Sequence, residues 1–225
     1  MNYQLNFTPV WQNLDVLLSG LWLGLALSLV SILLGCVLGL LAAFGSLSRH
    51  RGWRWLSLGY VTVVRNLPIL ILILLVYFAL PGIGIMLDQI GSFIVTLSFY
   101  AGAYLTEVFR AGLLNIPAGQ REAGQAIGLT EWQIKRWIII PVMFRNVLPS
   151  LGNNFISLFK DTSLAAAIAV PELTFYARKI NLESYRVIET WLVTSLLYIV
   201  SCYLIASVLR LLEKRLSLAH QEKSS

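Results

Sequence analysis

The chain has 225 residues, of which 57% are apolar and only 12% are charged. Ordinary globular proteins contain roughly 45–50% apolar and about 25% charged residues, so this composition excludes a typical soluble domain. The net charge of +6 would suit nucleic-acid binding, but basic residues that flank apolar runs more often follow the positive-inside rule of membrane proteins.

Several apolar runs approach the ~20 residues that cross a bilayer as one helix. We predict an all-α, polytopic membrane protein whose residues 1–225 form a single transmembrane domain. Its expected spans lie at about 17–45, 56–80, 91–108, 146–170 and 188–210.

The first span carries small residues at four-residue spacing, in two sets: Gly20, Gly24 and Ser28, then Gly35, Gly39 and Ala43. Such spacing lets helix backbones approach closely in lipid. No basic segment precedes this span and it is too long for a signal peptide, so we expect it to stay uncleaved.

A basic cluster follows the first span, where Arg49-His50-Arg51 and Arg54 lie beside two tryptophans. Basic charge with interfacial tryptophan marks a cytoplasmic boundary. We therefore expect the amino terminus outside. Arg210, Lys214 and Arg215 likewise predict a cytoplasmic carboxyl terminus.

The second span contains an unusual insert, Arg65-Asn66-Leu67-Pro68. An arginine and a proline at this depth are costly unless they face protein or a wet cavity. Arg65 could instead snorkel from a helix that begins near residue 67, but residues 67–80 are too few for a full crossing. We favour an inward-facing Arg65, and we expect a turn at Pro81-Gly82-Ile83-Gly84.

The fourth span is interrupted by Asn153-Asn154 and by Lys160-Asp161-Thr162-Ser163. These polar residues favour a face turned to a cavity, although Lys160 and Asp161 could also form a purely structural pair. Residues 171–187 are expected to be a polar loop on the outside. Its basic residues depart from the positive-inside pattern and could serve contact with an external partner.

Residues 109–145 form the longest polar stretch and predict a helix, a glycine turn and a second helix. Pro117 suits the first position of a helix, and Gly128 suits the left-handed position after its end. Thr130 and Gln133 fit a capping box, and Glu131 and Lys135 an i, i+4 pair. Basic residues place the stretch in the cytoplasm. DNA binding is disfavoured because membrane spans tether both ends.

The sequence lacks a nucleophile–base set, a metal-ligand spacing, paired carboxylates and the P-loop motif G-x-x-x-x-G-K-[ST]. We therefore expect no catalytic residues, no metal and no ATP site. Polar residues at membrane depth predict a translocation path, driven either by an ion gradient or by a separate ATPase. Three functions stay open from the residues alone: a subunit of an ATP-driven importer, an ion-coupled carrier, and a membrane-anchored regulator. Five spans are few to enclose a path, so a dimer of like subunits is expected.

The polar stretch resembles that of the membrane permease subunits of binding-protein-dependent ABC importers, in particular the polar amino acid group. That family's loop reads E-A-A, three residues, G, nine residues, I-x-L-P. Here Glu122-Ala123-Gly124 precedes Gly128 by three residues, and Ile138-Ile139-Ile140-Pro141 follows after nine more, so Gly124 and Ile140 depart from the pattern. Further matches are Gly119-Gln120, Arg65-Asn66-x-Pro68-x-Leu70, Lys160-Asp161-Thr162-Ser163-Leu164 and Pro171-Glu172-Leu173.

The resemblance covers roughly residues 14–216 and implies the type I importer permease fold with a cytoplasmic coupling helix inside residues 109–145. It implies an inner-membrane subunit that moves a polar L-amino acid, of the glutamate, aspartate or glutamine type or another polar amino acid, with ATP used by a separate ATP-binding subunit. Further implied partners are a second permease, a periplasmic amino-acid-binding protein and membrane lipid, but no nucleic acid.

The resemblance also implies two sets of site residues. Those of the ATPase-coupling loop are Gly119, Gln120, Glu122, Ala123, Gly124, Gly128 and Pro141. Those of the candidate substrate path are Arg65, Asn153, Asn154, Lys160, Asp161, Thr162 and Ser163. Arg65 is expected to meet an α-carboxylate. A common relative has Gly-Asn-Glu-Phe where this chain has Gly152-Asn153-Asn154-Phe155, which weakens the case for a cationic substrate.

Overall fold

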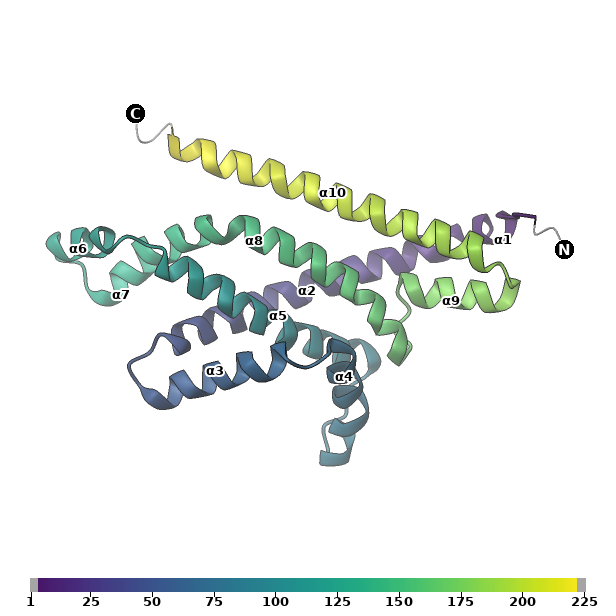
Figure 1. Ribbon diagram of the computed structural model, residues 1–225, viewed down its shortest axis with the longest axis horizontal. Helices are drawn as coiled ribbons and strands as arrows, with labels where there is room; N and C mark the ends of the chain where they lie inside the picture. Colours follow the sequence, from purple (N-terminus) through teal and green to yellow (C-terminus); the bar gives the residue numbers. More distant parts are fainter. Residues whose placement is uncertain (1–3, 222–225) are drawn as a thin grey trace.

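The computed structural model describes residues 4–221 as an elongated bundle of helices (Figure 1). Within that range no β-strand is present. The longer elements are α2 (Leu14–Ser46), α3 (Arg51–Arg65), α5 (Gln89–Leu114), α6 (Ala118–Ala126), α8 (Ile140–Asp161), α9 (Leu173–Ser184) and α10 (Val187–Gln221). The shorter ones are α1 (Thr8–Trp11), α4 (Ile69–Leu74), α7 (Glu131–Ile134), the π-helices η1 (Leu75–Ala79) and η3 (Lys135–Ile139), and the 3-10 helices η2 (Leu80–Ile83) and η4 (Thr162–Ile168).

Three helices of the described chain, α2, α5 and α10, are long and apolar enough to cross a membrane. The pair formed by α3 and the segment Ile69–Ile83 adds a fourth crossing if it is counted as one bent span. Helix α8 does not join them, because asparagines, prolines and charges lower the hydropathy of its apolar run. The expected count of five spans therefore stays a prediction.

The expected span 56–80 is interrupted where the sequence places Arg65-Asn66-Leu67-Pro68. Helix α3 ends at Arg65, α4 begins at Ile69, and the two helical segments diverge by 105°. Pro68 has no N–H to donate and disfavours helical backbone in the residue before it, so the chain bends there. The turn expected after this segment is confirmed, since Gly84 has a φ of +86° directly after η2.

The small-residue face of α2 is the surface on which the other helices pack. A Cβ atom added at Gly35 would lie 2.6 Å from the Cβ of Ala101, and one at Gly39 would lie 2.9 Å from the Cβ of Leu105. Both neighbours belong to α5. Helix α2 is apolar on all sides, so close approach at its glycines, and not hydrophobic periodicity, selects its buried face. The predicted packing role of this spacing is confirmed.

Helix α5 supplies the centre of the core. Its buried apolar residues recur at every fourth position: Phe93, Leu97, Ala101, Leu105 and Phe109. This spacing places them along one side of the helix, where they pack against α2 and against buried residues of α8 such as Met143 and Val147. Helix α5 thereby fixes the positions of the elements on either side of it.

The polar loop expected at 171–187 is wrong, because residues 173–184 form helix α9. Glu172 caps this helix by accepting hydrogen bonds from the backbone N–H groups of Thr174 at 2.9 Å and Phe175 at 2.8 Å. Its apolar residues Leu173, Ala177 and Ile180 lie at i, i+4 and i+7 and belong to a second core with parts of α1, α2 and α10. Both the cap and this periodicity are helix signals that the polar composition obscured.

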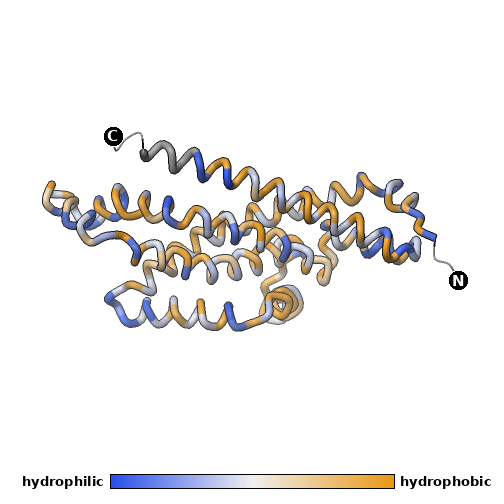
Figure 2. The backbone as a smooth tube through the Cα atoms, turned by 45° about the horizontal axis from the view of Figure 1, so that its top comes forward, coloured by the Kyte–Doolittle hydropathy of each residue, from blue (hydrophilic) through white to orange (hydrophobic). Residues whose placement is uncertain are grey.

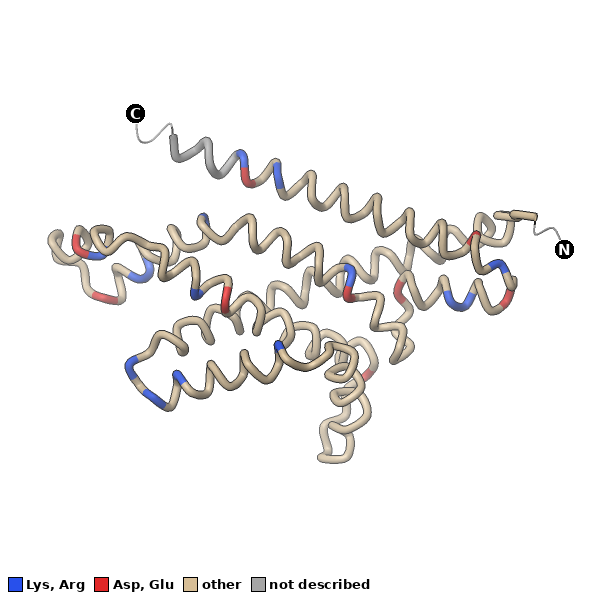
Figure 3. The backbone as a smooth tube through the Cα atoms, in the orientation of Figure 1, with Lys and Arg blue, Asp and Glu red and all other residues tan. Residues whose placement is uncertain are grey.

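Apolar residues predominate along the long helices (Figure 2), and many of their large apolar side chains are exposed. Helix α10 shows this most clearly, with Leu196, Ile199 and Leu204 between 57% and 65% exposed. Charged residues gather instead at the two ends of the bundle (Figure 3). This distribution is the one expected for a protein whose sides face lipid.

Candidate functional site

The segment formed by α6 and α7 lies at one end of the bundle (Figure 1) and turns sharply at Gly128. This residue has a φ of +80°, a conformation that glycine adopts without the steric cost of a Cβ. The N–H of Gly128 donates to the carbonyl of Gln125 at 3.0 Å, and the N–H of Leu129 donates to that of Gly124 at 3.1 Å. These two bonds form a Schellman motif that closes the carboxyl end of α6. The predicted left-handed glycine is confirmed.

A capping box begins α7, as predicted. The hydroxyl of Thr130 accepts from the N–H of Gln133, and the side chain of Gln133 accepts from the N–H of Thr130 at 2.8 Å. The expectation for Pro117 is wrong by one residue. Pro117 has an extended ψ of 136° and precedes α6, whose first residue is Ala118.

Glu131 of α7 forms hydrogen bonds with two residues of α6. The sequence analysis did not predict this contact. The carboxylate of Glu131 accepts from the Arg121 guanidinium at 2.8 Å and from the Gln125 amide at 3.0 Å. These hydrogen bonds, that of Arg121 first, lower the pKa of Glu131 below its ordinary value, whereas Lys135 acts on it only as a distant charge. The expected Glu131–Lys135 pair is therefore replaced by a contact across the turn. The useful signal was the i, i+4 spacing of Arg121 and Gln125 on one face of α6.

Gly124 explains how the two short helices pack so closely. It is the buried residue of α6, and an added Cβ would lie 2.9 Å from side-chain atoms of both Ile134 and Ile138. The family's usual alanine would need these isoleucines to shift. The departure from the family pattern at this position thus accompanies a tight contact with α7 and η3.

The remaining residues of the predicted coupling loop lie mostly on the exposed side of the segment. Gly119, Glu122 and Ala123 are exposed, Gln120 and Pro141 are half-buried. Near them, Ile127 is 75% and Trp132 is 69% exposed. The segment is internally braced and presents both charged and large apolar side chains outward. Such a combination is typical of a protein-contact surface.

Two tyrosines of α5 lie close to charged residues predicted at membrane depth. The guanidinium carbon of Arg65 lies 5.1 Å from the ring centroid of Tyr104, within the range of a cation–π contact. Tyr100 lies beside Tyr104, with ring centroids 4.7 Å apart and ring planes inclined by 44°, and Asp161 lies within electrostatic range of Tyr100. Residues of α3, α5 and α8 therefore converge. The sequence analysis missed these tyrosines as site residues, although their i, i+4 spacing in α5 was visible.

The other residues of the predicted path are more dispersed. Thr162 is buried, donates to the carbonyl of Phe159 at 2.6 Å, and lies against Gly24 of α2. Asn154 donates to the carbonyl of Ser150 at 2.8 Å, whereas Asn153 and Lys160 are exposed. Ser163 donates to the carbonyl of Lys160. Their roles stay predictions.

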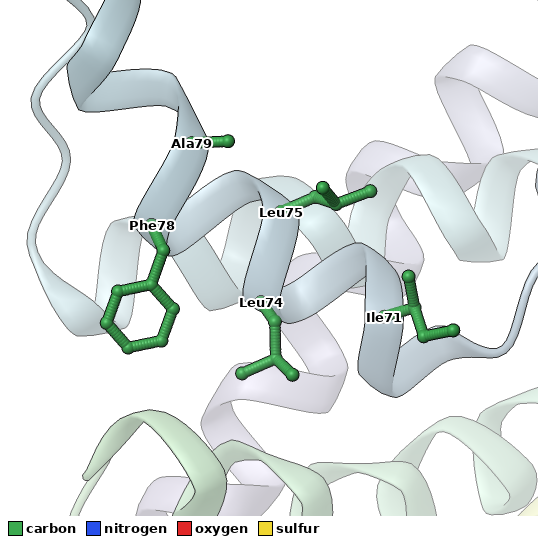
Figure 4. Close-up of a pocket in the computed structure, with 5 residues that line it drawn as sticks. All are labelled: Ile71, Leu74, Leu75, Phe78 and Ala79. Carbon is green, nitrogen blue, oxygen red and sulfur yellow. The ribbon is translucent and has the colours of Figure 1, made fainter.

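Helix α4 and η1 border this region with an apolar surface. Ile71, Leu74, Leu75, Phe78 and Ala79 line a shallow hollow of about 310 Å³ (Figure 4). Phe78 is 67% exposed, so this apolar surface is open to the surroundings. This surface is suited to contact with lipid or with protein inside the membrane.

Comparison with known proteins shows to which family the chain is similar. Residues 35–218 match the family of binding-protein-dependent transport system inner membrane components. The glutamine transport system permease protein GlnP of Escherichia coli (strain K12) is 34% identical over 219 residues, which cover 96% of this chain and 99% of that protein. The L-cystine transport system permease protein TcyB of Bacillus subtilis (strain 168) is 35% identical over 202 residues, which cover 89% of this chain and 86% of that protein.

A solved structure gives the same result. The crystal structure of an amino acid ABC transporter with histidines matches with a TM-score of 0.86 and 29% identity, covering 95% of this chain and 100% of that one. Permeases of this kind hydrolyse no ATP themselves, and they work with an ATP-binding subunit, a partner permease and a substrate-binding protein. The chain belongs to the family of binding-protein-dependent transport system inner membrane components, as a multi-pass permease subunit of an ABC importer.

Proposed function

We propose that the chain forms one half of a membrane path for a polar L-amino acid, and that the α6–α7 segment receives the ATP-binding subunit in the cytoplasm. One observation supports the path above the others. Arg65 of α3 lies over the ring of Tyr104, Tyr100 lies next to Tyr104 on α5, and Asp161 of α8 lies within electrostatic range of Tyr100. A zwitterionic amino acid carries both a carboxylate and an ammonium group, which such a cluster can complement.

The proposed orientation follows from the charges. The elements at the end of the bundle that holds α6 and α7 (Figure 1) carry many basic residues: Arg49, Arg51 and Arg54 between α2 and the start of α3, Arg110 near the end of α5, Arg121, Lys135, Arg136 and Arg145 from α6 to the start of α8, and Arg210 and Lys214 in the later part of α10. The opposite end carries Arg178, Lys179 and Arg186. By the positive-inside rule the first end is cytoplasmic. The amino terminus is then outside and the carboxyl terminus inside.

The proposed contact with the ATP-binding subunit rests on the shape of the α6–α7 segment. The Schellman motif at Gly128 and the ion pair of Arg121 with Glu131 brace it internally. Glu122 and Ile127 remain outward. Force applied to an exposed, braced segment is transmitted to the helices that follow it, whereas a flexible loop would absorb it.

Two substitutions test this contact in the complete importer. Glu122→Lys reverses an exposed charge, and Gly128→Val forces a β-branched residue into left-handed backbone. Both should leave the protein in the membrane while lowering the ratio of amino acid taken up to ATP hydrolysed. Normal uptake by both variants would contradict the proposed contact.

The proposed substrate class draws on the cluster and on the relatives. Relatives are named for the transport of glutamine, cystine, arginine and octopine, which are polar amino acids or amino acid derivatives. Arg65 would bind the carboxylate that these molecules share, and Asp161 with the tyrosine rings would face the ammonium group. Asn154, which stands where a common relative has glutamate, favours a neutral side chain on the substrate.

Uptake by the importer reconstituted in liposomes tests the path. Charged hydrogen bonds contribute about 1.5–3 kcal/mol, so Arg65→Gln should lower kcat/KM for uptake about 10- to 100-fold. Arg145→Gln removes the same charge from an exposed position at the start of α8 and serves as the matched control. Equal uptake by both variants would contradict the role of Arg65. Transport by the permease without its ATP-binding subunit would instead support an ion-coupled carrier.

A further inference from the structure

The turn between α2 and α3 together with the first residues of α3 (residues 49–56, hereafter the α2–α3 turn) carries positive charge that no acidic side chain of the described chain balances. Arg49, Arg51 and Arg54 are exposed, and within the described part of the chain no carboxylate forms an ion pair with any of them. In contrast, Arg110 and Arg121 at the same end of the bundle are paired with glutamates. The turn therefore has an unmet preference for an anion.

A hollow lies directly beside these arginines. It measures about 400 Å³ and is lined by His50, Gly52, Trp53 and Leu56. Gly52 leaves it open, because an added Cβ there would meet nothing within 4 Å. The lining combines a polar edge at His50 with apolar surface from Trp53 and Leu56. Inorganic phosphate would match the charge but not this apolar surface.

The exposed aromatic residues of the turn place it at the boundary of the bilayer. Trp53 is 63% and Trp55 is 71% exposed, and Leu56 is 66% exposed. Tryptophan is enriched where lipid headgroups meet the hydrocarbon. Clustered basic residues next to a transmembrane helix attract anionic lipid headgroups. The turn thus joins both halves of a phospholipid contact: unpaired positive charge and exposed apolar rings.

We propose that the α2–α3 turn binds an anionic phospholipid, whose headgroup phosphate contacts Arg49, Arg51 and Arg54 and whose upper acyl chain fills the hollow beside Trp53 and Leu56. Helix α3 begins at this turn and ends at Arg65. A bound lipid would therefore hold the cytoplasmic end of the helix that presents Arg65. This contact differs from the proposed amino acid path and does not depend on the identity of the substrate.

Lipid retention by the purified importer complex tests the proposal. The complex is placed in phosphatidylcholine nanodiscs containing phosphatidylglycerol or cardiolipin, and the lipids that stay bound are identified by native mass spectrometry. A basic residue near an anionic surface contributes about fivefold in affinity. Arg49→Gln with Arg51→Gln and Arg54→Gln should therefore weaken retention on the order of 100-fold. Raised salt should weaken the wild-type contact, because it shortens the screening length.

Two variants serve as controls. Arg178→Gln with Lys179→Gln removes exposed charge from α9 at the opposite end and should leave retention unchanged. Arg51→Lys with Arg54→Lys keeps the charge and should keep most of the binding. If loss of three arginines prevents insertion, Trp53→Ala with Leu56→Ala keeps the charge and removes the apolar wall, and retention should still fall several-fold.

Three results would overturn the proposal. The first is equal retention of anionic lipid by the triple glutamine variant, or by the Trp53 and Leu56 variant, and the wild type. The second is equal retention of phosphatidylcholine, which would indicate an ordinary lipid annulus. The third is unchanged lipid retention together with loss of the ATP-binding subunit from the triple variant, which would make the turn a protein contact.

Discussion

Two glycines of the α6–α7 segment allow a clean test of its backbone geometry. An added Cβ at either Gly119 or Gly128 would meet no atom within 4 Å, so substitution by alanine introduces no clash at either position. The two differ in backbone conformation. Gly119 lies inside helix α6, whereas Gly128 has a φ of +80°. Opposite effects on stability are therefore expected from the same chemical change.

The magnitudes follow from the conformations. Gly128→Ala places an L side chain in left-handed backbone, which costs roughly 1–2 kcal/mol. Gly119→Ala should stabilise the helix, because glycine in a helix loses more conformational entropy than alanine, but by less than the roughly 0.5–1 kcal/mol of a mid-helix position, since Gly119 is the second residue of α6. Gly128→Asn should lie nearer the wild type, since asparagine tolerates this conformation better than alanine.

Hydrogen exchange across residues 118–134 measures the effect in the intact importer. A cost of 1–2 kcal/mol raises the local opening equilibrium about 5- to 30-fold, so Gly128→Ala should exchange faster than wild type by that factor. Gly119→Ala should exchange more slowly. Equal exchange in the two variants would refute the assignment of a strained left-handed position to Gly128.

Three further outcomes are expected elsewhere. Gly35→Leu should destabilise the purified protein by about 1–3 kcal/mol, because it overpacks the contact between α2 and α5. Thermal unfolding in detergent measures this loss, and an unchanged unfolding temperature would contradict the contact. Arg121→Glu and Glu131→Arg should each weaken coupling of ATP hydrolysis to uptake and the double swap should restore it, so a double variant no better than the single ones would contradict the ion pair. Tyr104→Leu should raise the KM for uptake by removing the ring beneath Arg65 while Tyr104→Phe largely preserves it, and equal KM values would contradict the cation–π contact.

Local rules predicted most of the α6–α7 segment correctly. The left-handed Gly128 and the capping box of Thr130 with Gln133 each depend on residues within a few positions of one another. Such signals are complete in the sequence, because the groups that satisfy the helix ends are close neighbours. The small residues of α2 were equally readable, since their regular spacing has a direct steric meaning.

Contacts across a turn or between spans were harder to predict. Glu131 has two plausible basic partners, and only the folded geometry brings Arg121 closer than Lys135. Tyr104 is one of many aromatic residues in an apolar helix until Arg65 is placed beside it. Periodicity alone does not rank such alternatives, because it describes one helix and not how two helices cross.

Helix α9 shows a different limit. Its polar residues suggested a loop, yet Glu172 caps it and Leu173, Ala177 and Ile180 fill a small core. An amphipathic helix outside the long apolar spans resembles a polar loop in composition and differs from it only in the order of its residues.

The link between the two proposed sites is continuous helix. Residues 131–161 are helical without interruption through α7, η3 and α8. This helical stretch leads from Glu131 in the α6–α7 segment to Asp161, which lies near Tyr100. The π-helix at residues 135–139 ends two residues before Pro141. Proline has no backbone N–H and therefore cannot donate a hydrogen bond to the preceding turn. The widened turn accommodates this proline without ending the helix.

Arg65, by contrast, is positioned by contacts between α3 and α5. The hydroxyl of Tyr60 in α3 donates to the carbonyl of Phe99 in α5 at 2.6 Å, and Arg65 lies over Tyr104 of the same helix. The two charged residues of the proposed amino acid site therefore belong to different helices, Asp161 to α8 and Arg65 to α3, and both helices pack against α5. Under the proposed function, movement of the α6–α7 segment would shift α8 and change the distance between Asp161 and Arg65. A substrate held between these two residues would then be released by the motion that ATP hydrolysis drives.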